Sequence, residues 1–367
     1  MKMSKQTYTK PNPKNERVKR DYLRHVKEAR RRATSTVDGI RKALTRYEEY
    51  TGHRDFSAFN KELAIGFKTH LLTIKAQRTD ETLSKSTVLS TLNALKDFFR
   101  WLGCQPGFKS RIILTDIDYF SLSDKEARAA RSSRYGEWPT LEQVRKVIFS
   151  MPHTTDIEKR NRALIAFAIV TGMRDSAIAT IRLKHISFER GLVMQDPKEV
   201  KTKFSKRIDT FFFPVGDDIL DIVRDWITYL RAEKLYGPDD PVFPRTLTRQ
   251  DQDHCFVADG LQPIFWCNTT PIRQIYKAAF AGAGLPYFHP HSFRKTLVDL
   301  GQRSCKNPEE FKAWSQNLGH EDVLTTFTNY GQISPDRQGE VMRHIGQGDE
   351  QENKLDAIMR RLDNLGA

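Results

Sequence analysis

One stretch of the sequence constrains the fold more than any other, because residues 163–170 would be apolar on nearly every side of a helix. Their sequence is Ala-Leu-Ile-Ala-Phe-Ala-Ile-Val, and Thr171-Gly172 follows as a helix end. A helix that is apolar all round has to lie inside a core and be covered by other elements. We therefore predict a buried central helix with a globular domain built around it.

Most of the remaining pattern is also helical. Apolar residues at helical spacing predict three helices in the first part of the chain. The first ends at Gly52, the second is capped by Asn60, and the third ends at Gly103. Further along, Thr140 and Gln143 form a capping box that begins a new helix.

Strand signals are confined to one place. Residues 192–194 and 210–213 are strand-like and are joined by the lysine-rich turn 201–207, which predicts a β-hairpin with a basic tip. Residues 240–270 are rich in Pro, Asp and Gln and are predicted to be an irregular insertion. The expected fold is mainly α with a small β-sheet, in which an all-helical domain precedes an α+β domain.

A chain of 367 residues is long enough for two domains and tails. We expect a basic N-terminal arm at residues 1–29, a helical domain at 30–110 and a linker at 111–137. The α+β domain would occupy residues 138–345. Residues 346–367 carry an apolar stripe on a short helix, which would either pack on its own domain or dock on a neighbouring subunit.

The charge of the chain indicates a polyanionic partner. The formal net charge is +14, and residues 2–32 hold twelve Lys and Arg against three carboxylates. Such a segment is typical of nucleic-acid contact, and a solubilising tail is the alternative. With no long apolar run and no secretory signal, we expect a cytoplasmic, nucleoid-associated protein without membrane contact. Four scattered cysteines predict reduced thiols and no zinc site, and nothing indicates a metal or a cofactor.

The residues that carry chemistry lie in the second half. Arg174 follows Thr171-Gly172-Met173, His291 precedes Arg294 by three residues, and Tyr330 follows His320 by ten. Guanidinium groups neutralise phosphate oxygens, imidazoles move protons near neutral pH, and a phenol can attack phosphorus. This set can cleave a phosphodiester without a metal, although each residue alone has a structural explanation.

The same residues carry a family resemblance. Residues 135–345 resemble the catalytic domain of the tyrosine recombinase (phage integrase) family, which orders Thr-Gly-x-Arg, a hairpin lysine, His-x-x-Arg, Leu-Gly-His and Tyr. The matching positions are Arg174, a lysine of the 201–206 turn, His291, Arg294, His320 and Tyr330. Among Lys201, Lys203 and Lys206, we select Lys203 because its surroundings match the family turn best.

The resemblance implies a site-specific recombinase that acts on double-stranded DNA. Tyr330 would form a 3′-phosphotyrosine, and a homotetramer on two sites would exchange strands through a Holliday junction. The two domains would close as a clamp around the duplex. Accessory DNA-bending proteins are left open.

Two positions depart from the family pattern, and two alternatives remain. Ala177 stands where the family usually has a carboxylate that supports the first arginine, and Lys295 stands where a histidine is common. A type IB topoisomerase would share the chemistry but would not pair sites. A DNA-binding protein of the same fold could lack catalysis, although the retained Tyr330 argues against it.

Overall fold

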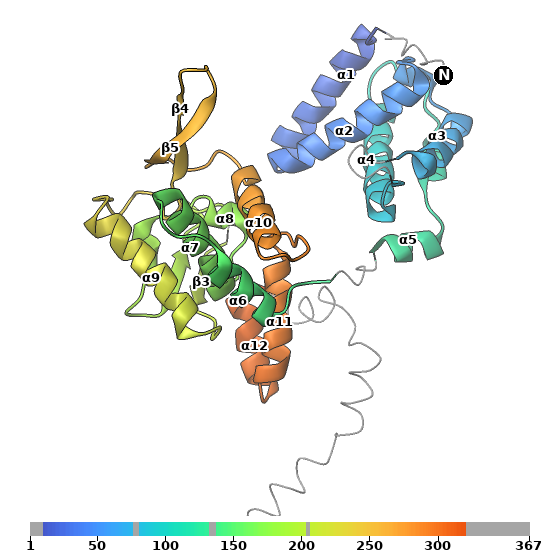
Figure 1. The fold of residues 1–367 in the computed structure, drawn as a ribbon. Coiled ribbons are helices and arrows are strands. Elements are labelled where there is room, and N and C mark those ends of the chain that lie inside the picture. The colour runs from blue at the N-terminus through green and yellow to red at the C-terminus, as the bar shows by residue number, and fades with distance from the viewer. Residues whose placement is uncertain (1–9, 76–80, 132–136, 203–205, 321–367) are drawn as a thin grey trace, which may run out of the picture. The chain divides into compact units, whose positions relative to one another are not determined.

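The structure is a computed structural model that describes residues 10–75, 81–131, 137–202 and 206–320. The chain divides into two compact units, Met1–Ser133 and Arg134–Ala367. The described part is mainly helical with two small antiparallel sheets, which confirms the predicted fold class (Figure 1). No helix within these ranges is long and apolar enough to cross a bilayer. The helix predicted at 346–367 lies outside the described residues.

The described part of the first unit is built from helices, apart from one isolated β-bridge between Lys75 and Thr82. Its helices are α1 (Pro13–Arg24), α2 (Thr34–Thr51), α3 (Lys61–Thr73), α4 (Lys85–Gly103) and α5 (Asp124–Arg131), with short turns η1 (His25–Ala29), η2 (Phe56–Ala58) and η3 (Leu114–Phe120). The three predicted helices are confirmed as α2, α3 and α4. Gly52 ends α2 in the left-handed conformation, and the Asn60 side chain accepts the Leu63 N–H at the start of α3.

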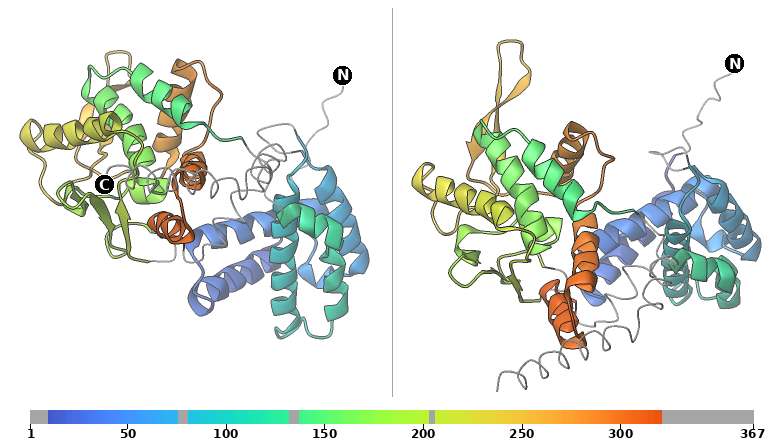
Figure 2. Two further views of the ribbon diagram at one scale, coloured as in Figure 1. Left: turned by 90° about the horizontal axis from the view of Figure 1, so that it is seen from below. Right: turned by 60° about the horizontal axis from the view of Figure 1, so that its bottom comes forward.

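The predicted N-terminal arm is wrong from Pro13 onward. Helix α1 lies against α2, as the views of Figure 2 also show, and the side chains of Tyr22 and Val26 are buried in the first unit's core. Val18, Tyr22 and Val26 recur every four residues, which is one face of a helix. The dense basic charge around this stripe obscured it in the sequence. Lys19 adds an ion pair to the buried carboxylate of Glu48 on α2.

The predicted linker at 111–137 is also wrong over its first part. Ile117 and Phe120 of η3 have no exposed surface and pack into the same core as α3 and α4. Phe120 contacts Phe59 and Phe99, which stack on each other with ring centroids 4.0 Å apart. Since each buried aromatic contributes about 1.5–3 kcal/mol, this segment belongs to the fold of the first unit.

The second unit contains the remaining elements in one core. They are α6 (Leu141–Ser150), α7 (Asp156–Thr171), α8 (Asp175–Ile178), η4 (Leu183–His185), β1 (Ile186–Ser187), β2 (Leu192–Gln195), β3 (Ile208–Phe211), α9 (Asp217–Ala232), β4 (Arg245–Gln250), β5 (Phe256–Gln262), α10 (Thr270–Gly282), α11 (Ser292–Ser304) and α12 (Pro308–Asn317). The predicted central helix is confirmed as α7, in which residues 163–170 are all buried. The capping box of Thr140 and Gln143 begins α6 as expected.

The predicted hairpin is confirmed, and β1 extends it to three strands in the order β1-β2-β3. Strands β2 and β3 are antiparallel, with Leu192 opposite Phe211 and Gln195 opposite Ile208. Strand β3 is therefore an edge strand of this sheet. The sequence missed β1 because it is only two residues long.

The predicted irregular insertion at 240–270 is wrong, because β4 and β5 form a second antiparallel hairpin. This hairpin extends away from the helices of its unit in Figures 1 and 2. Most of its side chains are exposed or half-buried, so no alternation of apolar residues marked it in the sequence. Arg160 of α7 anchors its base by donating to the Pro244 carbonyl at 2.9 Å and to Thr246 Oγ1 at 3.0 Å.

Candidate active site

The site begins where α7 ends. Gly172 has φ 59° and ends the helix in the left-handed region, where side chains are strained. A Cβ at this position would lie 2.8 Å from Leu297 Cδ1 and 2.9 Å from Leu318 Cδ2. Only glycine therefore lets the chain turn tightly against α11 and the end of α12. The turn places Arg174 at the N-cap of α8.

Arg294 ties this turn to the end of α12. Its side chain is buried, with Nη1 donating to the Gly172 carbonyl at 2.6 Å and Nη2 to the Leu318 carbonyl at 2.5 Å. Nη2 also lies 2.9 Å from Nε2 of His320. Because a guanidinium group can only donate, this Nε2 accepts, and the proton of a neutral His320 is on Nδ1. One arginine thus joins three of the predicted segments.

Both predicted arginines line one small hollow. The other residues of its lining are Thr171, Gly172, Met173, Gln195, Ile208, Thr210, Asn317 and Leu318. Arg174 and Arg294 are 120 positions apart in the sequence, and α7, α11 and the hairpin bring them together. The hollow has a volume of only about 10 Å³, so the two arginines form a positively charged surface that favours an anion such as a phosphate, and not an enclosed phosphate pocket.

His291 lies next to these charges. Its ring stacks on that of His289, with centroids 6.2 Å apart and an angle of 10° between the planes. Desolvation of the ring and the nearby cations Arg294 and Arg174 lower the pKa of His291 to about 4. His291 is an exposed residue, and the guanidinium charges of Arg294 and Arg174 disfavour its protonated form. His291 is therefore neutral at neutral pH in the unbound protein.

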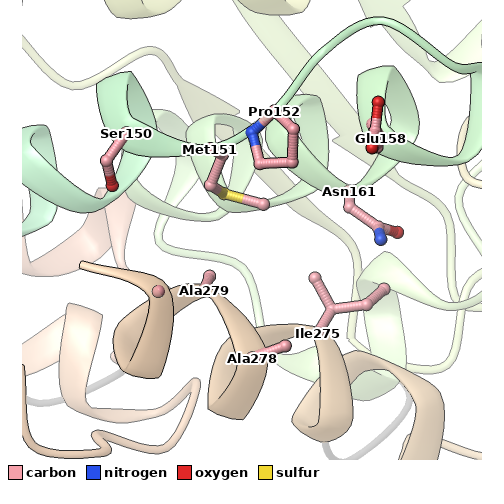
Figure 3. A pocket seen from close by; sticks show the side chains of 9 residues that line it. Ser150, Met151, Pro152, Glu158, Asn161, Ile275, Ala278 and Ala279 are labelled. Carbon is pink, nitrogen blue, oxygen red and sulfur yellow. The ribbon is translucent and has the colours of Figure 1, made fainter. Parts of the chain in front are cut away.

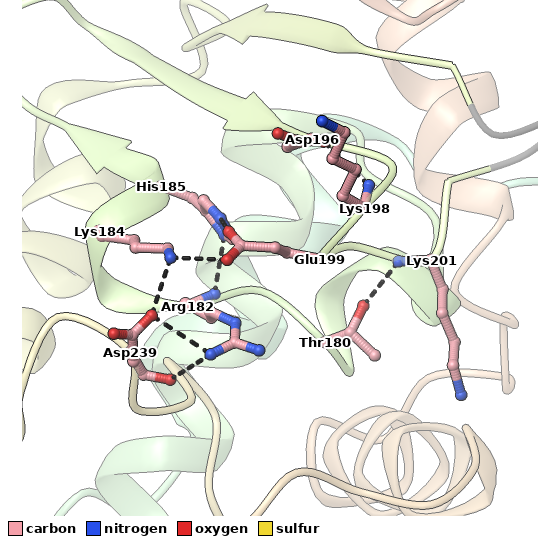
Figure 4. Close-up of polar contacts among 9 residues, drawn as sticks. All are labelled: Thr180, Arg182, Lys184, His185, Asp196, Lys198, Glu199, Lys201 and Asp239. Carbon is pink, nitrogen blue, oxygen red and sulfur yellow. Dashed lines mark hydrogen bonds and ion pairs between the residues drawn. The ribbon is translucent and has the colours of Figure 1, made fainter.

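The segment that leads from β2 into the lysine turn is held by two sets of contacts (Figure 4). The carboxylate of Glu199 accepts hydrogen bonds from Nζ of Lys184 at 2.7 Å and from Nε2 of His185 at 2.8 Å. These two partners lower the pKa of Glu199 to about 2. The backbone of Lys201 is bonded to the segment just after α8, because its N–H donates to Thr180 Oγ1 at 2.9 Å. The carbonyl of Lys201 accepts from Ser176 Oγ at 3.3 Å.

Two predicted site residues cannot be placed. Lys203 and Tyr330 lie outside the described residues, so their roles stay predictions. The structure brings together the other four, because Arg174 and Arg294 share the hollow, His320 is bonded to Arg294, and His291 lies within the electrostatic influence of both arginines.

At the position where the family usually has a carboxylate, this chain has an alanine that packs into the core. Ala177 is buried and has no polar group to offer. Asp175 instead accepts from Arg273 of α10, with Nη2 at 3.0 Å and Nε at 3.3 Å from Oδ2. Its Oδ1 also accepts the N–H of Ser176 at 2.9 Å. The start of α8, next to Arg174, is thus tied to α10. No sequence pattern indicates this pair, because its partners are 98 residues apart.

A second hollow lies on another part of this unit, between the α6–α7 connection and α10 (Figure 3). It has a volume of about 200 Å³ and is lined by Met151, Pro152, Ile275 and small or polar residues. Its lining contains no arginine, lysine or histidine. It therefore lacks the groups that phosphate chemistry requires.

Comparison with known proteins assigns the family. Residues 139–337, more than half of the chain, match the model of the phage integrase family. The chain belongs to the phage integrase family. The resemblance inferred from Arg174, Arg294, His320 and Tyr330 is confirmed at the level of the family, and the matched range contains all six predicted site residues.

Curated relatives in this family are distant but match over most of their length. The tyrosine recombinase XerC of Lactobacillus delbrueckii subsp. bulgaricus is 23% identical over 312 residues, which cover 84% of this chain and 92% of the relative. The tyrosine recombinase XerD of Pasteurella multocida is 21% identical over 297 residues, covering 80% and 85%.

Solved structures share the fold. A lambda integrase dimer bound to a COC′ core site aligns with a TM-score of 0.58 at 12% identity, covering 87% of this chain and 78% of that one. The XerH recombinase bound to palindromic difH substrate aligns with a TM-score of 0.55 at 17% identity, covering 88% and 84%.

Proposed function

We propose that this member of the phage integrase family is a site-specific DNA recombinase that cleaves and rejoins strands through a 3′-phosphotyrosine at Tyr330. The observation that carries the proposal is the convergence of Arg174 and Arg294 on one hollow, with His291 and His320 beside them. Relatives named as recombinases, and structures of this fold bound to DNA, support the same function.

In the proposed reaction, the arginines act on the scissile phosphate. A phosphodiester resists attack because its anion repels nucleophiles and its alkoxide leaving group is poor. Arg174 and Arg294 would neutralise the non-bridging oxygens, and the three fixed contacts of Arg294 would hold it ready before DNA binds. The charge stabilisation in this scheme comes from the side chains, so the reaction needs no metal.

Proton transfer accompanies the attack. The Tyr330 oxygen would bond to phosphorus as the bond from phosphorus to the 5′ oxygen breaks, and its proton would pass to a neighbouring base. Neutral His291 is suited to accept a proton or a hydrogen bond. Lys203, or Lys201 or Lys206 of the same turn, would protonate the departing 5′ oxygen. A 5′-hydroxyl of the partner strand then reverses these steps and rejoins the DNA.

The proposal extends to the assembly. Four protomers would hold two duplex sites and exchange strands through a Holliday junction, each protomer enclosing DNA between its two units. The net charge of +14 supports a duplex partner. Such an enzyme would work in the cytoplasm on the nucleoid, with or without accessory DNA-bending proteins.

The test is strand exchange on the protein's own target. Sequencing the DNA that becomes covalently attached to the protein in cells would identify the target, and purified protein would then be given two copies of it. We expect covalent adducts and recombinant junctions. Adducts with relaxed DNA but no junctions would indicate a type IB topoisomerase. DNA binding without adducts would indicate a non-catalytic protein and would overturn the proposal.

A further inference from the structure

An unusual contact joins the end of α12 to the edge of the three-stranded sheet. The Phe211 N–H donates to Oδ1 of Asn317 at 2.7 Å, and Nδ2 of Asn317 donates to the Phe211 carbonyl at 2.9 Å. The Asn317 amide thus pairs with an edge strand as one residue of a fourth strand would. Only a side chain with both an acceptor and a donor can make this pair of bonds.

Further contacts make the same junction rigid. Thr210 Oγ1 donates to the Asn317 carbonyl at 3.4 Å and accepts from Gln195 Nε2 at 2.8 Å, so both strands of the hairpin take part. Gly319 leaves no room for a side chain, because a Cβ there would lie 2.9 Å from Ile208 Cδ1 on β3. The hairpin and residues 317–320 therefore form one packed unit.

This junction lies between two parts of the candidate site. On one side, the next residue after Asn317 supplies the carbonyl that binds Arg294, and His320 follows two residues later. On the other side, β3 receives the chain directly from the lysine turn 201–207. Any shift of β3 against Asn317 would change the distance between the hairpin lysine and the phosphate site. A misplacement of about 1 Å can cost roughly 100-fold in rate.

We propose that Asn317 is a positioning residue that fixes the hairpin, and with it the general-acid lysine, against the turn that carries His320. The inference rests on the proposed function and assigns a role to a residue that lines the hollow of Arg174 and Arg294 but whose side-chain amide is bonded to the backbone of Phe211. Loss of the Asn317 amide slows protonation of the departing 5′ oxygen more than it affects DNA binding or the stabilisation of the phosphate charge.

The test compares two leaving groups. In one DNA the scissile 5′ oxygen is present, and in the other it is replaced by sulfur. A thiolate with a pKa of about 8.5 leaves without help, whereas an alkoxide requires a proton donor. We expect Asn317→Ala to form covalent adduct roughly 10–100-fold more slowly than the unmodified protein on ordinary DNA. On the sulfur substrate the variant regains most of this rate.

The matched control is Asn307→Ala at the other end of α12. Asn307 caps the helix by accepting the Glu310 N–H at 2.9 Å, so its loss weakens the same helix without touching β3. This control cleaves both substrates at rates within about threefold of the unmodified protein. Loss of the cap lowers stability by about 1 kcal/mol and does not affect proton transfer. Asn317→Asp keeps the shape and the acceptor but turns a carboxylate oxygen toward the Phe211 carbonyl, and is at least as slow as Asn317→Ala.

Three outcomes overturn the inference. The first is that Asn317→Ala cleaves ordinary DNA at the normal rate. The second is that it is equally slow on both substrates. The third is that its loss of cleavage rate is no larger than that of Asn307→Ala. Absence of any adduct with the unmodified protein on both substrates is a different result, because it overturns the proposed function itself and the inference with it.

Discussion

Arg294 offers the strongest test of how the site is held together. Because its guanidinium donates to the Gly172 carbonyl, the Leu318 carbonyl and His320 while the side chain is buried, Arg294→Ala removes three contacts at once. A hydrogen bond from a charged donor contributes about 1.5–3 kcal/mol, and the contributions of neighbouring bonds add incompletely. We expect the free energy of unfolding of the second unit to fall by about 3–5 kcal/mol.

The assay is thermal unfolding followed by tryptophan fluorescence. Four of the five tryptophans, Trp138, Trp226, Trp266 and Trp314, belong to the second unit and report on it. For a unit of this size, 1 kcal/mol shifts the melting temperature by roughly 2–4 °C, so Arg294→Ala should melt roughly 10 °C lower.

The control lies on the same helix. Arg303 is largely exposed and pairs with Asp299 one turn away, so Arg303→Ala should cost no more than about 0.5 kcal/mol. An Arg294→Ala variant that melts within a degree or two of the Arg303→Ala control would refute the reasoning. If the expected difference appears, cleavage by Arg294→Ala has to be measured well below its melting temperature, since the substitution acts on both fold and chemistry.

Two further predictions concern stability. Lys184 and His185 hold the pKa of Glu199 at about 2. The stability that these contacts contribute is therefore fully present above the ordinary pKa of a glutamate, 4.5, and is lost as pH falls toward 2. Melting temperatures measured against pH should show the unmodified protein above Glu199→Gln at pH 6 and converging with it by about pH 2, and a constant gap would contradict the assignment. Gly172→Ala should destabilise the second unit by about 1–3 kcal/mol more than Gly191→Ala in chemical denaturation, because both glycines have positive φ but only Gly172 is crowded. Equal losses would show that crowding at Gly172 is unimportant.

The sequence predicted correctly those elements that are determined by neighbouring residues. The end of α7 at Gly172 and the cap of α3 at Asn60 follow from single residues and their neighbours. The β2–β3 hairpin also followed from short apolar runs around a basic turn. The order of the chemical residues was sufficient to predict the family, because the spacing of Arg174, Arg294 and the later residues is set by that same fold.

The sequence failed where distant contacts decide the outcome. The basic charge of residues 1–29 predicts an arm where the structure has helix α1. Only three apolar residues indicate the helix, and they stabilise it only because Phe98 of α4 covers Tyr22. The β4–β5 hairpin depends on Arg160 of α7, which is 84 residues from its first acceptor. The bonds between Asn317 and Phe211 span 106 residues, and nothing near either residue indicates the other.

The measurement that tests the central claim most directly is the identity of the residue that becomes attached to DNA. The unmodified protein, Tyr330→Phe and Tyr287→Phe would each be incubated with a nicked substrate that traps the cleaved state, and the attached peptide would be sequenced. Tyr287 is a suitable control because it is a half-exposed phenol near Arg273 and Asp175. We predict a 3′-phosphotyrosine on the peptide containing Tyr330, its loss in Tyr330→Phe and its retention in Tyr287→Phe. An adduct that persists in Tyr330→Phe would contradict the account.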